Sequence, residues 1–205
     1  IYGESIVVRI LDQSKGMVPI EHLGMSRDMF QQLMPVLQGS TGAILTTGPT
    51  GSGKSTSMYS MIGATSWKAR GMSLFTLENP VEYELGNGAR QTEVTETMTW
   101  AKGLRAILRQ DPDIVLVGEI RDHETAEHLV SAAMTGHLVF STLHTNTAVQ
   151  CFARLIGLGV EPGAIIAAVK LIIAQRLVRR LCPNCRKAHP RTSQLMRVHG
   201  EMLKQ

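Results

Sequence analysis

The chain has 205 residues, of which 43% are hydrophobic and 19% are charged. This composition is typical of a globular protein and excludes a disordered tail, a collagen-like repeat and a disulfide-stapled miniprotein. The net charge of +4 fits a solvated surface. It also fits an anionic partner such as a nucleotide, a nucleic acid or lipid headgroups, and charge alone does not choose among these.

Neither a membrane span nor a signal peptide is expected. The longest apolar run, Ala164 to Ala174, is interrupted by Lys170 and is shorter than the roughly 18–20 residues that cross a bilayer. The pattern of a signal peptide is missing. Because the chain begins with Ile1 and the first predicted strand follows almost at once, we expect a piece of a longer protein.

The predicted elements alternate along the chain. A short strand is expected over 5–11, then a loop over 13–24. Further short apolar runs predict buried strands over residues 43–47, 72–77, 114–117 and 137–142. Helices are predicted between them, over residues 28–37 with Ser26 as N-cap, 54–65 and 123–134. Strands that alternate with helices indicate an α/β fold with a mainly parallel sheet covered by helices on both faces.

Two apolar stripes predict further helices. Trp100, Leu104, Ile107 and Leu108 share one helix face, and Asp111-Pro112 ends that helix. A second stripe consists of Val149, Phe152, Ala153 and Ile156. A last apolar helix is predicted to open at Glu161-Pro162 and to run on towards Arg180.

A glycine-rich segment joins the strand over 43–47 to the helix over 54–65. It matches the Walker A pattern G-x-x-x-x-G-K-[ST], and the flanking strand and helix argue against a chance match. Glycines let successive N–H groups point inwards, and the helix amino end adds partial positive charge, so a polyphosphate fits. We expect Lys54 to reach the β- and γ-phosphates and Ser55 to bind Mg²⁺. The predicted nucleotide-binding residues are Gly48, Pro49, Thr50, Gly51, Ser52, Gly53, Lys54, Ser55 and Thr56.

Carboxylates follow two of the predicted strands. Glu119 ends the segment that begins at Ile114, as in a Walker B element, although an Asp usually stands where Gly118 is. Such a carboxylate can hold Mg²⁺ or position the attacking water. Glu78 ends the strand over 72–77 and can accept a proton from that water. Solvated acids at strand ends are the alternative for both.

Two histidines bracket the fourth buried strand. A histidine after the strand, such as His144, can donate a hydrogen bond to a γ-phosphate oxygen and sense its loss. His137 stands before the strand. A structural role is the alternative for each, and it is the stronger one for His137.

Five motifs together resemble a known family. In order, they read GPTGSGKST, LENPVEY, GLRAILRQDPDIVLVGEIRD, TGHLVFSTLHTN and AQRLVRRLCPNC. Over residues 3–190 the chain resembles the secretion ATPases of the GspE/PilB type, which drive type II secretion and type IV pilus assembly. The resemblance implies a RecA-like core over 26–181. It also implies the end of an upstream domain over 1–25 and the start of a cysteine-containing segment over 182–205.

The resemblance also implies roles, cofactors and partners. Glu78 and Glu82 would belong to an acidic box, Glu119 would lie near Mg²⁺, and His137 and His144 would form a histidine box. ATP and Mg²⁺ would bind in a homo-hexamer whose arginines complete the site. The candidate arginines are Arg9, Arg121 and Arg176, with structural ion pairs as the alternative for the last two. The ring would act in the cytoplasm on an inner-membrane platform protein, peripheral to the membrane, with no nucleic acid expected.

Two features of the chain depart from the family pattern. Asn79 replaces the Asp of the acidic box, and an amide carries no charge; because Glu78 and Glu82 remain, we still expect hydrolysis. Cys182 and Cys185 supply half of the four ligands of a zinc site. We expect their partners beyond Gln205, with His189 and His199 as the alternative. Cys151 is expected to be a core residue, and the cysteine pair favours secretion or pilus extension over retraction.

Two other function classes remain open. A nucleic-acid motor fits the positive charge, but stacking aromatics interleaved with basic residues are scarce; DNA-stimulated turnover would favour it. A regulatory module that binds nucleotide without turnover is supported only by Asn79, and binding without phosphate release would favour it.

Overall fold

The computed structural model describes residues 3, 4, 6, 8, 17–86 and 88–187. Arg9, His189, His199 and most of the strand predicted over 5–11 lie outside the described residues. In the part that is described, no helix is long and apolar enough to cross a membrane.

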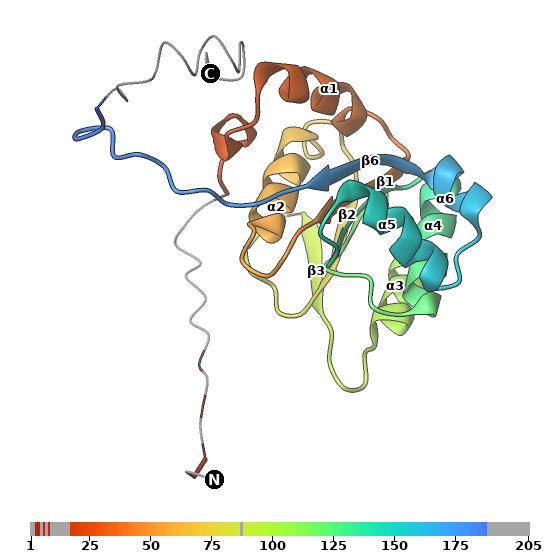
Figure 1. Ribbon diagram of the computed structural model, residues 1–205. Coiled ribbons are helices and arrows are strands. Elements are labelled where there is room, and N and C mark those ends of the chain that lie inside the picture. Colours follow the sequence, from red (N-terminus) through yellow and green to blue (C-terminus); the bar gives the residue numbers. More distant parts are fainter. Residues whose placement is uncertain (1–2, 5, 7, 9–16, 87, 188–205) are drawn as a thin grey trace.

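Within the described residues, six parallel strands form one sheet between the helices (Figure 1). The strand order is β3-β2-β4-β5-β1-β6. Their bounds are β1 Gly42–Thr47, β2 Leu74–Glu78, β3 Ala89–Glu93, β4 Ile114–Val117, β5 Leu138–Leu143 and β6 Val169–Ala174. The four inner strands are fully buried, as expected for a parallel sheet with helices on both faces.

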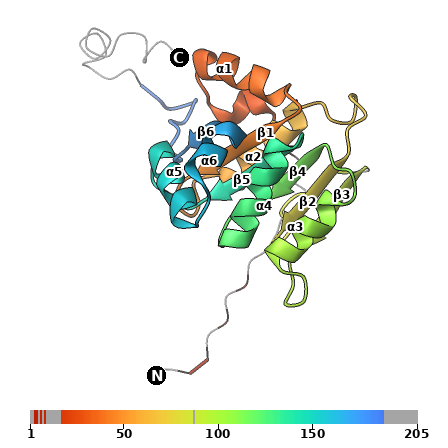
Figure 2. The same ribbon diagram turned by 90° about the vertical axis from the view of Figure 1, so that its right-hand side faces the viewer.

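Helices cover both faces of the sheet (Figure 2). One face carries the 3₁₀ helix η1 (Ile20–Leu23), α1 (Arg27–Leu37) and α2 (Lys54–Ala64). The other carries α3 (Trp100–Leu108), α4 (His123–Met134), α5 (Ala148–Gly157) and α6 (Pro162–Ala168). Residues of the inner strands serve the two cores in turn: Ala43 and Leu45 pack with the α3–α6 side, while Ile44 packs with the α1–α2 side. The α/β class with a parallel sheet is therefore confirmed.

Several predicted boundaries are confirmed closely. The strand over 114–117 and the helix over 123–134 are found as predicted. The Ser26 hydroxyl accepts a hydrogen bond from the Met29 amide at 3.2 Å, so Ser26 caps α1 as expected. Polar side chains likewise cap α3, α4 and α5 through Thr99, Asp122 and Thr147.

The last predicted helix is wrong in its second half. Helix α6 ends at Ala168, and the chain continues directly as strand β6, which pairs with β1. Val169 and the Leu171–Ile173 run suit a strand, and the edge of β1 offers backbone groups that need hydrogen-bond partners. Tertiary pairing therefore overrides the apolar periodicity that predicted a helix.

The structure differs from the predictions at two further places. Strand β3 was not predicted, because Ala89–Glu93 is a half-exposed edge strand without an alternating apolar pattern. The apolar stripe of α5 does not face the core: Val149 is 78% exposed, whereas Cys151 and Leu155 are buried. The helix is rotated so that the face carrying Cys151 packs on the sheet, which confirms Cys151 as a core residue.

Candidate active site

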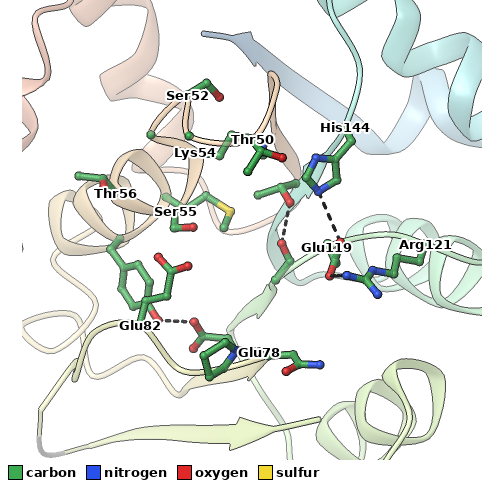
Figure 3. A pocket seen from close by; sticks show the side chains of 18 of the residues that line it. Thr50, Ser52, Lys54, Ser55, Thr56, Glu78, Glu82, Glu119, Arg121 and His144 are labelled. Atoms are coloured by element: carbon green, nitrogen blue, oxygen red, sulfur yellow. Dashed lines mark hydrogen bonds and ion pairs between the residues drawn. The ribbon is translucent and has the colours of Figure 1, made fainter. Parts of the chain in front are cut away.

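The predicted phosphate-binding and acidic residues meet at one edge of the sheet. Because all six strands are parallel, their carboxyl ends lie at the same edge, where α/β folds bind ligands. The phosphate loop follows β1, Glu78 ends β2, Glu119 follows β4 and His144 follows β5. Figure 3 shows these side chains around a common space.

The phosphate loop is shaped by close backbone contacts. A Cβ atom added to Gly48 would lie 2.5 Å from the Gln175 carbonyl oxygen and from the Ser52 hydroxyl, so only glycine fits there. Gly53 is the N-cap of α2 in the left-handed conformation, with a φ of 82°, and no side chain caps the helix. The first N–H groups of α2 therefore have no side-chain acceptor among the described residues, which suits an anion.

Lys54 is buried at the start of α2. Its ammonium group donates hydrogen bonds to the Gly48 and Pro49 carbonyl oxygens at 2.9 and 3.0 Å. Burial lowers the pKa of Lys54, and the nearby Glu119 carboxylate opposes that shift. The loop thus holds a concentrated positive charge close to its own backbone.

Glu78 at the tip of β2 is buried and hydrogen-bonded by uncharged side chains. The Tyr59 hydroxyl, from α2, donates to Glu78 Oε2. The Gln91 amide, from β3, donates to Glu78 Oε1 at 3.4 Å. Burial raises the pKa of Glu78, and hydrogen bonds from neighbouring side chains offset part of that rise.

Glu119 lies after β4, between two basic side chains (Figure 3). Arg121 Nη2 lies 2.6 Å from Glu119 Oε1, and His144 Nε2 lies 3.5 Å from Glu119 Oε2. The Thr142 hydroxyl donates to the Gly118 carbonyl at 2.7 Å, which ties the end of β5 to the segment carrying Glu119. His144 is therefore held near the carboxylate by the pairing of β4 with β5.

These groups line one pocket of about 630 Å³, a volume in the range of ligand sites. Its lining contains most of the predicted site residues, namely Thr50, Gly51, Ser52, Gly53, Lys54, Ser55, Thr56, Glu78, Glu82, Glu119, Arg121 and His144. Gly48 and Pro49 contribute through their carbonyl groups, which accept from Lys54. The fold thus brings together residues that are up to 94 positions apart, from Thr50 to His144.

Other predicted site residues do not reach this pocket. His137 precedes β5 at the opposite edge of the sheet, where its ring nitrogen lies 3.0 Å from the Ala132 carbonyl oxygen. Arg176 is exposed and donates to the Asn146 and Gln175 carbonyl oxygens, both at 2.9 Å. Cys182 and Cys185 are exposed, and the described residues include no cluster of three or more metal-ligating side chains.

Three residues that support the site were not predicted. Tyr59 stands four positions after Ser55, and this helical spacing could have placed it on the pocket side of α2. Gln91 belongs to the unpredicted strand β3. Gln175 holds the phosphate loop from the end of β6: its amide donates to the Ser52 carbonyl at 2.6 Å and its backbone N–H to the Thr47 carbonyl at 2.9 Å. The sequence offers no signal for the last two.

Comparison with known proteins shows the family of the chain. The family model described as "Type II/IV secretion system protein" matches residues 1–203. The type II secretion system protein E of Klebsiella pneumoniae is 49% identical over 190 residues, which are 92% of this chain and 38% of that protein. The type II secretion system ATPase E of Vibrio cholerae is 46% identical over 189 residues, covering 92% of this chain and 37% of that protein.

A solved structure is similar as well. The crystal structure of the pilus retraction motor PilT with bound ADP matches with a TM-score of 0.67 and 37% identity, over 79% of this chain and 49% of that one. The chain spans less than two fifths of the length of the two relatives named above. Since the family model covers nearly the whole chain and close relatives agree with it, the chain belongs to the type II/IV secretion system protein family.

Proposed function

We propose that this chain is the ATP-hydrolysing core of a hexameric motor that powers type II protein secretion or type IV pilus assembly. The observation that carries the proposal is that Lys54 of the phosphate loop, Glu78 and Glu119 line the same pocket. The relatives named for type II secretion favour the secretion side. The cysteine pair of the sequence favours secretion or pilus extension over retraction.

The residues of the pocket fit a nucleotide polyphosphate. The uncapped N-terminus of α2, the glycine at 53 and the Lys54 ammonium supply hydrogen-bond donors and positive charge within one loop. The phosphate oxygens would replace the Gly48 and Pro49 carbonyls as acceptors for Lys54. Ser52 adds a buried hydroxyl for which no partner is found among the described residues.

The pocket also fits a magnesium ion. Mg²⁺ prefers oxygen ligands and usually keeps several waters, and the Ser55 hydroxyl and the Glu119 carboxylate both line the pocket. We assign these two side chains as its protein ligands, directly or through water. When bound, the ion would neutralise charge on the phosphates.

Hydrolysis needs a group that takes the proton of the attacking water. Glu78 is assigned this role because it is a buried carboxylate that lines the same pocket as Lys54. As the water oxygen bonds to the γ-phosphorus and the bond to the ADP oxygen breaks, the proton passes to Glu78. His144, beside Glu119, is placed to sense the loss of the γ-phosphate.

The motor would work as part of a larger assembly. Arginines of a neighbouring domain would complete the ATP site, and domain rotation after phosphate release would act on an inner-membrane platform protein. Arg121 is a candidate within the chain itself, because it lines the pocket. We place the ring at the cytoplasmic side of the inner membrane. The zinc half-site at Cys182 and Cys185 stays a prediction.

The test is phosphate release by the assembled protein. Lys54→Ala is expected to abolish ATP binding and to lower turnover by at least about 10²-fold, because it removes the charge that holds the phosphates. Nucleotide binding is measured in parallel with a fluorescent ATP analogue. If Lys54→Ala and Glu119→Gln both hydrolyse ATP at the wild-type rate, the site assignment is wrong.

A further inference from the structure

We propose that Tyr59 and Gln91 are positioning residues that orient the Glu78 carboxylate towards the attacking water and stabilise its charged form. The inference rests on the proposed function, in which Glu78 is the base. Tyr59 lines the same pocket as Glu78, and Gln91 lies behind it on β3. Each supplies one hydrogen bond to one oxygen of the carboxylate.

The contact between Tyr59 and Glu78 is deeply buried. The exposed fraction is 1% for Tyr59 and 5% for Glu78. A carboxylate in such surroundings is costly to ionise unless donors compensate for the lost water. Tyr59 and Gln91 are neutral donors, so they stabilise the negative charge without cancelling it. This is the environment that a base buried in a pocket requires.

Both donors are themselves fixed by neighbouring contacts. The Tyr59 ring packs edge-on against the Tyr83 ring, with centroids 5.0 Å apart. The Gln91 amide also donates to the Tyr83 carbonyl at 2.9 Å and accepts from the Leu85 backbone N–H at 2.8 Å. The loop after β2 therefore fixes the side chains of Tyr59 and Gln91, and these two side chains fix the orientation of the Glu78 carboxylate.

The geometry leaves capacity for a water molecule. An ionised carboxylate has about four lone-pair sites on its two oxygens, and the two donors occupy one on each. The remaining sites can accept the proton of a water in the pocket that Glu78 lines. Tyr59 also connects this base to the phosphate loop, because it stands on α2 four residues after Ser55.

The electrostatic setting gives the inference a direction. Burial raises the pKa of Glu78 and the carboxylate of Glu82 adds to the rise, whereas the side chains of Thr76, Tyr59 and Gln91, in that order, lower it. Lys54 and Glu119 line the same pocket, and the Tyr83 ring contacts the Tyr59 ring edge-on. Without the Tyr59 hydroxyl, a larger share of Glu78 would be protonated at neutral pH, and a protonated carboxyl cannot take a proton from water.

The experiment is the pH profile of ATP hydrolysis by Tyr59→Phe in the assembled protein. The acid limb of kcat is expected to move to higher pH by about one unit, since a hydrogen bond to a charged group is removed. On the acid limb, below both midpoints, kcat should fall about tenfold, while KM for ATP stays within about twofold. Gln91 is not substituted, because it also holds the backbone of the loop.

The matched control is Tyr83→Phe, which removes the same hydroxyl from the neighbouring ring. No hydrogen bond from the Tyr83 hydroxyl is found within the described residues, so the pH profile is expected to stay as in the wild type. If Glu78→Gln keeps wild-type turnover, the base assignment fails and the inference fails with it. If Glu78→Gln is inactive but Tyr59→Phe keeps the wild-type profile, only the inference is overturned.

A second measurement uses the unaltered protein, so it does not depend on whether a variant folds. The sequence has three tyrosines, so the ring-carbon NMR signals of ¹³C-tyrosine can be followed during an acid titration of the unaltered protein. The Tyr59 signal should shift with the same midpoint as the Glu78 carboxyl carbon. A Tyr59 signal that ignores the titration of Glu78 would contradict the inference, whatever the activity of the variants.

Discussion

The tips of β2 and β4 hold their carboxylates in different ways. Glu78, at the end of β2, is buried and receives hydrogen bonds from the neutral side chains of Tyr59 and Gln91. Glu119, after β4, has a side chain 14% exposed, and it lies between Arg121 and His144. The hydrogen bond and the charge of Glu119 raise the pKa of Arg121, so that partner remains a cation.

This difference suits different tasks. Neutral donors orient a carboxylate and leave its charge available to attract a proton. The cationic Arg121 pairs directly with the other carboxylate, which suits an acid that holds cations or water. In the proposed reaction, Glu78 therefore takes the proton of the water and Glu119 helps to hold Mg²⁺. Environments that separate two carboxylates in this way commonly divide acid–base work from electrostatic work.

The largest expected effect is the loss of either carboxylate, and the two losses should differ in kind. Glu78→Gln removes the base and is expected to lower kcat by about 10²–10⁴-fold with little change in nucleotide affinity. Glu119→Gln should in addition raise the Mg²⁺ concentration needed for nucleotide binding, by about tenfold or more. Phosphate release and titration of nucleotide binding with Mg²⁺ measure the two effects.

The control is Glu82→Gln, which removes a half-buried carboxylate from the same pocket wall. It should lower kcat less than Glu78→Gln does. Equal Mg²⁺ requirements for Glu78→Gln and Glu119→Gln would show that the two strand tips share one role, and the comparison would break down.

Most of the residues lining the pocket follow from the sequence, because they are placed by local patterns. A Walker A segment after a strand, and acids directly after strands, must meet at one edge once the sheet is parallel, so Lys54, Glu78 and Glu119 were predicted correctly to be neighbours. His144 was predicted by the same logic. His137 shares the strand with it but precedes that strand, and the same rule sends it to the opposite edge.

The supporting contacts could not be predicted, because they depend on pairings between distant segments. Gln91 reaches Glu78 only because a polar edge strand pairs with β2. Gln175 reaches Ser52 only because the chain after α6 becomes a strand beside β1. The composition of β3 is polar and that of β6 also suits a helix, so neither indicates a strand. Both segments become strands because the backbone groups at the edges of the sheet need hydrogen-bond partners.

A smaller effect is expected from the partner of Glu119. Arg121→Gln should lower kcat/KM for ATP only about two- to fivefold, because the Arg121 side chain is 65% exposed and exposed ion pairs contribute little. The difference from wild type should shrink in about 1 M salt, where the Debye length is about 3 Å. Activity measured at low and high salt checks this.

The matched control for Arg121 is Arg105→Gln. Arg105 pairs with Glu124 at 2.7 Å with a side chain 51% exposed, on α3 and α4 and outside the pocket lining. Its removal should leave kcat/KM unchanged at either salt concentration. A loss of 10²-fold or more in Arg121→Gln that salt does not affect would instead identify Arg121 as a residue that contacts the nucleotide.

The smallest effect is on stability, and it tests the burial of Glu78 without any catalysis. Its pKa in the folded protein is raised above that of the unfolded chain. Below the pKa that Glu78 has in the unfolded chain, the carboxyl is protonated in both the folded and the unfolded protein, and its burial does not lower stability. As the pH rises through the pKa of Glu78 in the folded protein, the native state loses stability. Glu78→Gln avoids that loss. Its Tm should therefore exceed that of the wild type by about 2–4 °C at pH 8, and the difference should vanish near pH 4.

The control for this stability prediction is Glu96→Gln, at an exposed position. It should show a smaller change in Tm between the two pH values. A Glu78→Gln protein less stable than wild type at pH 8 would mean that the bonds from Tyr59 and Gln91 outweigh the cost of burial.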